Sequence, residues 1–388
     1  MKIHGIPQWP IAQNDDEIML KNVLYSNSWW KNTGKYVKQF EMEFANYQQC
    51  KYGVAVTNGT VALEIALKGL GIKAEDEVIV PDFTFYSTVS AVMTIGAIPV
   101  LVDVKKDTFC IDPNEIKKAI TKKTKAIIVV HIGGQICDMD EICAIAEENN
   151  LYIIEDSSHA PGAKWHNKKA GSFGHVGTFS FQNAKLLTAG EGGMLVSNDK
   201  ELMHEVLLQS NCGREEGDTD YRHIRLATNA RLSEFQAAVL HSQFMKLEEQ
   251  MRLREKNYKY ISQKLSKVKG IKLQKIDEKT NVHSHYMIMF YYNPDEFNGA
   301  SRKKFIEYLQ KIGIPASKSY KPIHELPLFQ TIDNNKFRIV CKNGNFCSNT
   351  KEIGENVVCL SHNILLSDYI TLDKIVDAIY DFKFCQEK

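Results

Sequence analysis

From about residue 51, short runs of apolar and β-branched residues alternate with segments of helical periodicity. The helical segments cover residues 60–70, 87–96, 113–120 and 138–149. The apolar runs around them are VIVP from Val78, IPVLVDV from Ile98, AIIVV from Ala126 and LYIIED from Leu151. Unbroken apolar strands are typical of a parallel sheet buried on both faces, and regular strand–helix alternation favours right-handed crossovers. The sequence therefore predicts an α/β fold with a mostly parallel central sheet.

A second, smaller part is expected after this layer. Two further strands, GTFSF from Gly177 and GGMLVSND from Gly192, follow with only a loop between them. A long amphipathic helix then begins at Gln236. After it, apolar runs such as HYMIMFYY alternate with helical ones such as SRKKFIEYLQKIG, which indicates an α+β arrangement. We therefore divide the chain into a large domain, residues 1–245, and a connector helix with a small C-terminal domain, residues 246–388.

The charge balance and the cysteines narrow the class of protein. The 48 basic and 47 acidic side chains give a net charge of +1, which favours neither a nucleic acid nor a membrane surface as partner. Apolar runs are strand-sized, too short to span a bilayer. The nine scattered cysteines, without a C-x-x-C motif or an N-terminal signal peptide, predict reduced thiols and a cytoplasmic protein. His283 and His285 are the best metal candidates, but they lack a suitably spaced partner, so we expect no metal.

One lysine stands apart from all other charges. Lys185 lies in FSFQNAKLLTAGEGG, between the last two strands, with no acid within five residues on either side. Desolvation in an apolar, glycine-lined loop makes an amine neutral more often, and a neutral amine can form a Schiff base with a carbonyl. The alternative is the commoner fate of a single lysine, a side chain that reaches water from the end of a loop.

Other segments could serve an aldehyde cofactor that carries a pyridine ring and a phosphate. Glu155 and Asp156 end a predicted parallel strand, where α/β proteins bind ligands, and a carboxylate there would keep the ring nitrogen protonated. His159 could hydrogen-bond a phenolic oxygen. Gly59 and Thr60 open a helix, which suits a phosphate. Each feature also has a structural reading: a helix cap, a solvated turn or a buried histidine.

Taken in order, the motifs NGTVAL, PDFTFYST, EDSSHAPGA, FSFQNAKLLTAGEGG and TNARLSEFQAA resemble the sugar aminotransferases of the DegT/DnrJ/EryC1/StrS family. The resemblance covers residues 58–238, with weaker similarity at SHYM and KPIHELPLF. It implies a fold type I enzyme with pyridoxal 5'-phosphate (PLP) held covalently on Lys185 and pyridoxamine phosphate as the intermediate. It also implies a homodimer with the site at the subunit interface. The amino group would pass from L-glutamate or L-glutamine to a keto sugar, nucleotide-linked or simple, or to a ketocyclitol, in amino-sugar or secondary-metabolite biosynthesis.

The same resemblance implies a role for each matching residue. Lys185 would be catalytic, Asp156 would meet the pyridinium nitrogen and His159 the phenolic oxygen. Phe85 would stack on the ring. The phosphate contacts would be Gly59, Thr60, Val61, Ser180 and, from the neighbouring subunit, Asn229. The substrate would meet Arg231, Tyr320 and His324.

The subtype and two other classes of function stay open. The pattern FSFQ-x-x-K-x-x-T-x-GEGG looks more like the subgroup that acts on ketocyclitols, simple keto sugars or aminobenzoate precursors, with a nucleotide-linked keto sugar as the alternative. Lysine at position 185 argues against the branch that carries histidine there and performs deoxygenation. A different PLP enzyme, such as a lyase or desulfurase using Cys212, and a non-catalytic PLP-binding regulator are the competing classes. The charged loop 213–229 could select the acceptor or cover the site.

Overall fold

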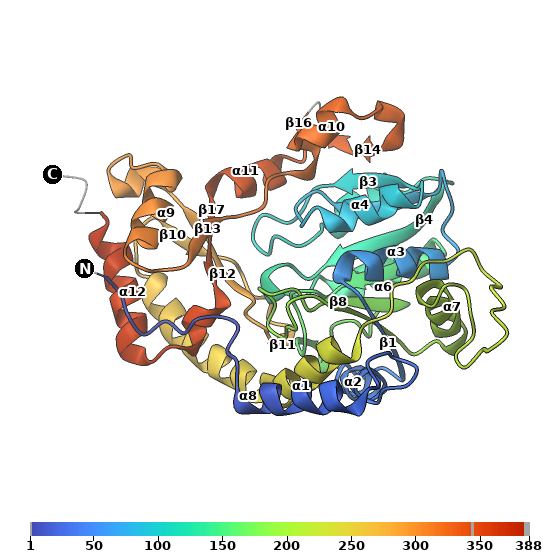
Figure 1. The fold of residues 1–388 in the computed structure, drawn as a ribbon. Coiled ribbons are helices and arrows are strands. Elements are labelled where there is room, and N and C mark those ends of the chain that lie inside the picture. Colours follow the sequence, from blue (N-terminus) through green and yellow to red (C-terminus); the bar gives the residue numbers. More distant parts are fainter. Residues whose placement is uncertain (1, 343–344, 384–388) are drawn as a thin grey trace.

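An eight-stranded sheet forms the centre of the molecule in the computed structural model, which describes residues 2–342 and 345–383 (Figure 1). The strand order is β1-β9-β8-β5-β4-β2-β3-β14. The six strands from β8 to β14 run parallel, whereas β9 and β1 are antiparallel to their neighbours. The strands are β1 (Tyr52–Val56), β2 (Glu77–Pro81), β3 (Ile98–Val102), β4 (Thr124–Val130), β5 (Tyr152–Asp156), β8 (Val176–Ser180), β9 (Gly193–Ser197) and β14 (Arg338–Ile339).

Helices cover both faces of this sheet, and alternate strand residues face opposite layers. Ile127 and Val129 of β4 pack in the cluster that includes α5 and α6, whereas Ala126 and Ile128 pack in the cluster with α3, α4 and α7. The mostly parallel α/β layer predicted from the apolar runs is therefore confirmed. The helices are α3 (Gly59–Gly69), α4 (Ser87–Thr94), α5 (Pro113–Ala119), α6 (Met139–Glu148) and α7 (Lys200–Ser210).

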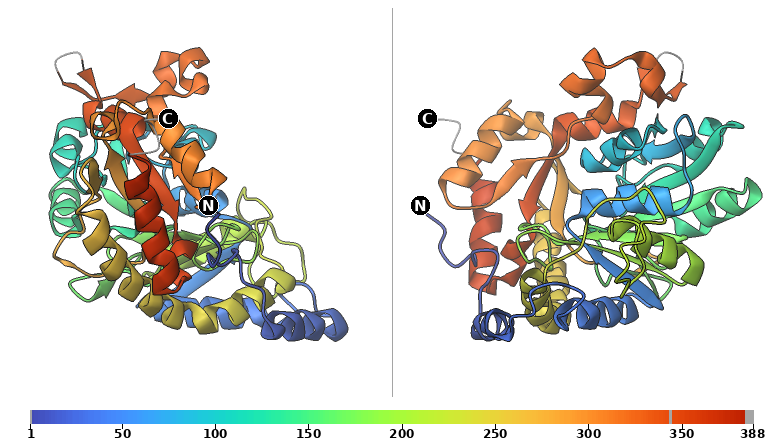
Figure 2. Two further views of the ribbon diagram at one scale, coloured as in Figure 1. Left: turned by 90° about the vertical axis from the view of Figure 1, so that its left-hand side faces the viewer. Right: turned by 45° about the vertical axis from the view of Figure 1, so that its right-hand side comes forward.

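Two helices from the first fifty residues pack against the long helix α8 (Figures 1 and 2). Helix α8 (Glu234–Leu265) starts with a capping box in which Ser233 and Gln236 bond each other's backbone N–H groups. It runs from the large sheet to the second part of the chain, as its amphipathic pattern predicted. The two N-terminal helices are α1 (Asn14–Ser26) and α2 (Tyr36–Tyr47).

The second part is built on a four-stranded antiparallel sheet, ordered β10-β12-β17-β13. Its core joins residues of this sheet to residues of α8, α9 and α12. The elements are β10 (Ile271–Leu273), β12 (Met287–Tyr292), α9 (Arg302–Lys311), β13 (Ala316–Lys318), α10 (Pro327–Thr331), α11 (Ser348–Asn356), β17 (Val357–Ser361) and α12 (Tyr369–Asp381). Two minor sheets contain β11 (Thr280–Val282), β6 (Lys164–Trp165) and β7 (Lys168–Lys169), and β15 (Cys341–Lys342) with β16 (Asn345–Phe346).

The C-terminal part also contributes to the large sheet. Strand β14 pairs in parallel with β3, with Arg338 beside Val100 and Ile339 beside Leu101. The second part thus supplies an edge strand to the large sheet, and residues beyond position 245, such as Leu247, Met289 and Val357, also belong to the core clusters of that sheet. The division at residue 245 stays a prediction.

The described cysteines form no disulfide bonds with one another. Seven of the nine cysteines have described side chains and all seven are free thiols, whereas Cys385 lies outside the described residues. None of the described helices combines the length and the apolarity that crossing a bilayer requires.

Candidate active site

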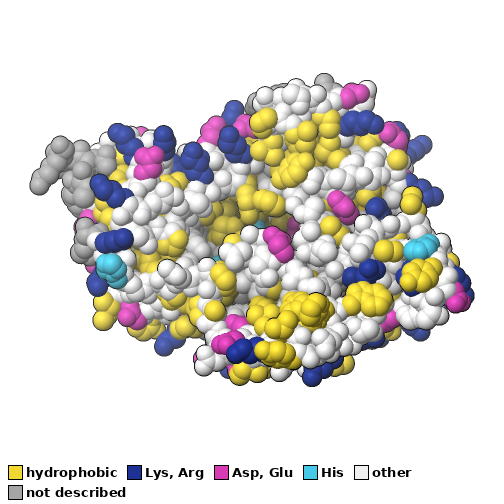
Figure 3. All heavy atoms as spheres, viewed as in Figure 1, with side chains coloured by type: hydrophobic (Ala, Val, Ile, Leu, Met, Phe, Trp, Pro, Cys, Tyr) yellow, Lys and Arg dark blue, Asp and Glu magenta, His cyan; other side chains and the backbone are white. Residues whose placement is uncertain are grey.

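A cavity of about 590 Å³ lies at the carboxyl ends of the parallel strands. Tyr286 and Tyr320 close it from the C-terminal part, while the other lining residues belong to the large sheet and its helices. Figure 3 shows the molecule hollowed between the two parts, with hydrophobic side chains around the hollow. The lining residues from the large part are Asn58, Gly59, Thr60, Val61, Leu63, Thr84, Phe85, Ser87, Val130, Asp156, Ser158, His159, Ser180, Gln182, Lys185 and Glu191.

Lys185 points into this cavity from the loop between β8 and β9. Its Nζ lies 4.7 Å from the centre of the Tyr286 ring, so an aromatic face forms one wall around the amine. Burial lowers the pKa of Lys185 to about 8, and the nearby charge of Asp156 opposes that shift only in part. The neutral, nucleophilic form of this amine is therefore far more populated near neutral pH than it is for an ordinary lysine.

The backbone around Lys185 is held by two side chains from distant segments. The indole N–H of Trp9 donates to the carbonyl oxygen of Lys185 at 3.0 Å, and Nε2 of His362 donates to that of Ala184 at 3.2 Å. The Trp9 and His362 rings meet edge to face with centroids 4.7 Å apart. The guanidinium of Arg254 lies 5.3 Å from the Trp9 ring centre. No sequence motif pointed to this support, because it depends only on tertiary contact.

The two carboxylates at the end of β5 face opposite sides of the sheet, because successive strand residues alternate. Asp156 faces the cavity, where Oδ2 accepts a hydrogen bond of 3.0 Å from the Thr88 hydroxyl. Glu155 faces the other side. It accepts bonds of 2.6 to 2.7 Å from the N–H groups of residues 171, 173 and 174, and its Oε2 lies 3.0 Å from Nε2 of His131. Only Asp156 is thus available to a ligand in the cavity.

His159 is buried and oriented by its neighbours. Its Nδ1 accepts the N–H of Gly133 at 3.3 Å, which leaves the ring proton on Nε2, 3.4 Å from the Tyr320 hydroxyl. The ring stacks on Tyr286 with centroids 4.1 Å apart. Burial, and secondly the charge of Lys185, hold the pKa of His159 well below its usual value. The imidazole is therefore neutral, with an N–H donor facing the cavity.

Three hydroxyl side chains meet at the cavity where α3 begins. The Thr60 hydroxyl lies 2.7 Å from that of Ser87, and both residues line the cavity together with Ser180. A side chain at position 59 would place its Cβ 2.8 Å from Cβ of Ser180, so this close approach requires glycine. Asn58 caps the helix by accepting the N–H of Val61, which therefore already has a partner. Hydroxyls at the N-terminus of a helix suit a phosphate.

The donor set of this cavity fits PLP. It offers an anion site for the phosphate and a carboxylate for the ring nitrogen. A neutral histidine could donate to the phenolic oxygen, and the amine of Lys185, with its lowered pKa, could react with the aldehyde. Phe85 borders the cavity with 56% of the residue exposed, as expected of an aromatic side chain left uncovered for a ligand.

Three residues predicted to contact the cofactor or the substrate do not line this cavity. Asn229 is exposed on the surface. The Arg231 guanidinium donates to Asn211 at 2.9 Å and lies 3.6 Å from the Cys212 sulfur, so Arg231 and Cys212 lie together outside the cavity. His324 also lies outside the cavity lining, with its Nδ1 2.6 Å from Oδ2 of Asp82. In contrast, Tyr320 lines the cavity, and so does Tyr286, which the SHYM motif contained but to which no role was assigned.

Comparison with known proteins agrees with this geometry. Residues 11–379 match the DegT/DnrJ/EryC1/StrS aminotransferase family. The chain is 35% identical to 3-amino-5-hydroxybenzoate synthase of Amycolatopsis mediterranei (strain S699), over 97% of this chain and 98% of the relative. It is 33% identical to the L-glutamine:2-deoxy-scyllo-inosose aminotransferase of Streptoalloteichus tenebrarius, over 86% of this chain and 82% of the relative. The crystal structure of 3-amino-5-hydroxybenzoic acid synthase superposes with a TM-score of 0.92 at 34% identity, over 98% of this chain and 99% of that one.

A fold type I architecture with a buried lysine facing a carboxylate defines a class of PLP-dependent transferases. Within this class, the chain belongs to the DegT/DnrJ/EryC1/StrS aminotransferase family, and the resemblance seen in its motifs is confirmed. It is an aminotransferase, which sets aside the lyase and regulator alternatives.

Proposed function

We propose that the chain binds PLP covalently through Lys185 and transfers an amino group from L-glutamate or L-glutamine to the keto group of a ketocyclitol or a simple keto sugar. The observation that carries this proposal is the buried amine of Lys185, with its pKa lowered to about 8, in a cavity that also contains Asp156. A nucleotide-linked keto sugar is the second candidate for the acceptor.

Asp156, His159 and Lys185 would each have a separate role in the reaction. When bound, PLP supplies an aldehyde that exchanges amino groups and a protonated ring that withdraws electrons from the reacting carbon. Asp156 would hold the proton on the ring nitrogen, since a carboxylate favours the positive form. The N–H of His159 would donate to the phenolic oxygen. A neutral Nζ of Lys185 would take the proton from the donor's carbon and pass it to the cofactor in the first half of the reaction, and would move a proton from the cofactor to the carbon that becomes aminated in the second half.

The acceptor class rests on the relatives and on the segment around Lys185. One relative is named as a synthase of an aminohydroxybenzoate and another as an aminotransferase of a deoxy-scyllo-inosose, a ring ketone without a nucleotide in its name. The stretch FSFQNAKLLTAGEGG resembles the subgroup acting on such compounds, and Gln182 and Glu191 of this stretch line the cavity. Both are polar groups able to hydrogen-bond ring hydroxyls.

The site would be completed by a second copy of the chain. Lys185 is the only Lys or Arg side chain among the described residues that line the cavity, so the phosphate lacks a charged partner from its own chain. Hydrophobic side chains gather along the face shown in Figure 3, and the exposed large side chains include Trp29, Trp30 and Leu226. We infer a homodimer in which Asn229 of the partner subunit reaches the phosphate.

An absorbance spectrum of the purified protein tests the first half of the reaction. Wild type loaded with PLP should show a visible band that Lys185→Ala lacks, and excess L-glutamate or L-glutamine should bleach it. Bleaching by one donor identifies that donor. If the loaded wild type shows no lysine-dependent band, the assignment of Lys185 is wrong; a band that neither donor bleaches would overturn the proposed donors.

The acceptor is tested on the bleached protein. Recovery of the visible band should follow addition of a ketocyclitol or a simple keto sugar but not of a nucleotide-linked keto sugar. Recovery only with the nucleotide-linked compound would favour the second candidate. The dimer is tested separately with Asn229→Ala, which should weaken PLP binding by about 10-fold or more, the loss expected for a hydrogen bond to a charged group.

A further inference from the structure

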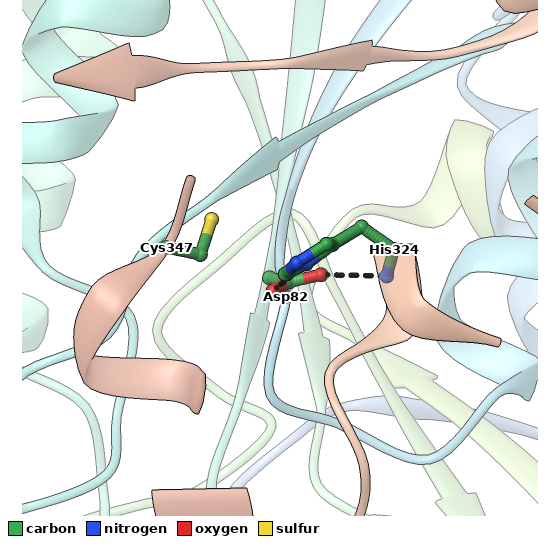
Figure 4. Close-up of side chains that lie close together, drawn as sticks. All are labelled: Asp82, His324 and Cys347. Atoms are coloured by element: carbon green, nitrogen blue, oxygen red, sulfur yellow. Dashed lines mark hydrogen bonds and ion pairs between the residues drawn. The ribbon is translucent and has the colours of Figure 1, made fainter. Parts of the chain in front are cut away.

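Three side chains from separate segments meet beside the cavity, at the end of β2. Asp82 follows β2, His324 lies in the 3-10 helix Ile323–Glu325, and Cys347 precedes α11 (Figure 4). One ligand atom from each lies within 4.8 Å of the other two. Among the described residues, this is the only group of three or more His, Cys, Asp or Glu side chains that meets this criterion. The group does not line the PLP cavity.

Two of these three groups are buried, and His324 is partly buried. Asp82 and Cys347 are 0% and 2% exposed, and the one ion pair formed by Asp82 among the described residues is with His324. The imidazole points at the carboxylate, with Nδ1 2.6 Å from Oδ2 (Figure 4). The other carboxylate oxygen, Oδ1, accepts the backbone N–H of His324 at 3.0 Å. A carboxylate, an imidazole and a thiol that meet at a mostly buried place form a donor set able to hold a metal ion.

We propose that Asp82, His324 and Cys347 bind a zinc ion. A thiolate, an imidazole nitrogen and a carboxylate oxygen are the donor types that zinc takes in proteins, and three such ligands leave the fourth tetrahedral position for water. On binding, the S–H proton of Cys347 and any proton shared by His324 and Asp82 pass to solvent, so the ion replaces the present hydrogen bonds. The His283–His285 pair, the best candidate from the sequence, instead forms a mutual hydrogen bond of 3.0 Å.

The position of the site indicates what the ion would do. Asp82 belongs to the large sheet and lies two residues before Thr84, which lines the PLP cavity. The other two ligands come from the C-terminal part, and the backbone N–H of Ile323 already donates to the Asp82 carbonyl at 3.0 Å. A zinc ion would therefore fasten two C-terminal segments to the end of β2, next to the loop that carries Phe85.

Zinc content of the PLP-loaded, full-length protein tests the proposal. After incubation with zinc and removal of the free ion by gel filtration, wild type should retain about one zinc per chain. Cys347→Ser and His324→Gln should each retain less than about a tenth of an equivalent, because each removes one of three ligands. Cys143→Ser is the matched control: its thiol is partly buried on α6, outside the group, and this variant should bind zinc as wild type does.

Two outcomes would overturn the zinc site: wild type that retains no zinc, or a Cys347→Ser variant that retains as much as wild type. If Cys347→Ser does not fold, cobalt replaces zinc as the probe in wild type. A near-ultraviolet thiolate-to-cobalt band, seen as a difference spectrum against the cobalt-free holoenzyme, would support Cys347 as a ligand. Cobalt bound without that band would contradict it. Because the readout is metal content, failure of the zinc site leaves the proposed aminotransferase chemistry untouched.

Discussion

The indole N–H of Trp9 donates a hydrogen bond of 3.0 Å to the carbonyl oxygen of Lys185, 176 residues further along the chain. Together with the bond from His362 to Ala184, it fixes the backbone on which the reactive amine is carried. A side chain near the N-terminus therefore takes part in positioning a group at the centre of the large domain. Small displacements of a reacting group are costly in rate, so this bond has a kinetic consequence.

Trp9→Phe should keep most of the packing against His362 and remove the donor. We expect the free energy of unfolding to fall by about 1 kcal/mol, because the Lys185 carbonyl loses its hydrogen-bond donor. We expect turnover to fall by about 10-fold, because the lysine loses a positional restraint. Urea unfolding and steady-state rates measure both. Tyr291→Phe is the control: that hydroxyl donates to the Lys106 carbonyl at 3.0 Å, outside the cavity and the lysine loop, and its loss should change neither quantity appreciably. Equal behaviour of the two variants would contradict the positioning role.

The lowered pKa of Lys185 predicts how the rate of PLP uptake by the cofactor-free protein depends on pH. Only the neutral amine attacks the aldehyde, so the rate of PLP uptake should rise with pH and level off above about 8, well below the ordinary lysine value of 10.5. Stopped-flow absorbance at a series of pH values gives the midpoint. Asp156→Asn removes the charge that raises this pKa, so the midpoint should move to lower pH. A midpoint close to the ordinary lysine value would show that burial does not lower this pKa, and an upward shift in the variant would contradict the effect assigned to Asp156.

Asp156→Ala should retain the visible band of lysine-bound PLP but lose turnover by at least about 100-fold, the scale of removing one preorganised electrostatic partner. The ring nitrogen would no longer keep its proton, and the electron-withdrawing power of the cofactor would fall. Steady-state rates and the spectrum of the loaded variant are measured together. Turnover near that of wild type would mean that another group meets the ring nitrogen.

Replacing Glu155, the neighbour of Asp156 in the chain, should lower the stability of the fold and leave the cofactor site largely unchanged. Its carboxylate accepts three backbone N–H bonds, from residues 173 and 174 at Oε1 and from residue 171 at Oε2, and in Glu155→Gln an amide NH₂ would replace one of these oxygens and face at least one of the donors. We expect a loss of about 2 kcal/mol in the free energy of unfolding, the cost of leaving buried groups without partners, and a largely unchanged spectrum of the loaded protein. Denaturant titration checks this. A variant as stable as wild type would show that the loop does not depend on this carboxylate.

The sequence predicted those parts of the fold that have a repeating local pattern. Helices α3 to α6 and strands β2 to β5 lie within a few residues of the predicted segments, because their apolar spacing is set by the layers that cover them. The two-residue strand β14 has no such pattern, since two residues cannot show a period. No helix was predicted in the first fifty residues, although Val37, Phe40 and Phe44 of α2 recur at helical spacing and are buried in the structure.

Site residues that lie within local motifs were predicted, and site residues from distant parts of the chain were not. Residues within motifs at strand ends, such as Gly59, Asp156 and Lys185, were predicted to share a site, and they do line one cavity. Trp9 and Tyr286 could not be assigned, because their contacts with the lysine loop come from elements far away in the chain. The local sequence also could not tell Asp156 from Glu155, which differ only in the direction set by strand alternation.

The pairing of β14 with β3 bears on how the protein is made. Strand β3 has an open edge until residues 338 and 339 leave the ribosome, so the large sheet cannot be completed during most of translation. An unpaired edge invites pairing with other chains. Nascent or truncated chains that end before β14 should therefore aggregate more readily than the whole protein, because β14 protects a sheet whose other strands are synthesised much earlier.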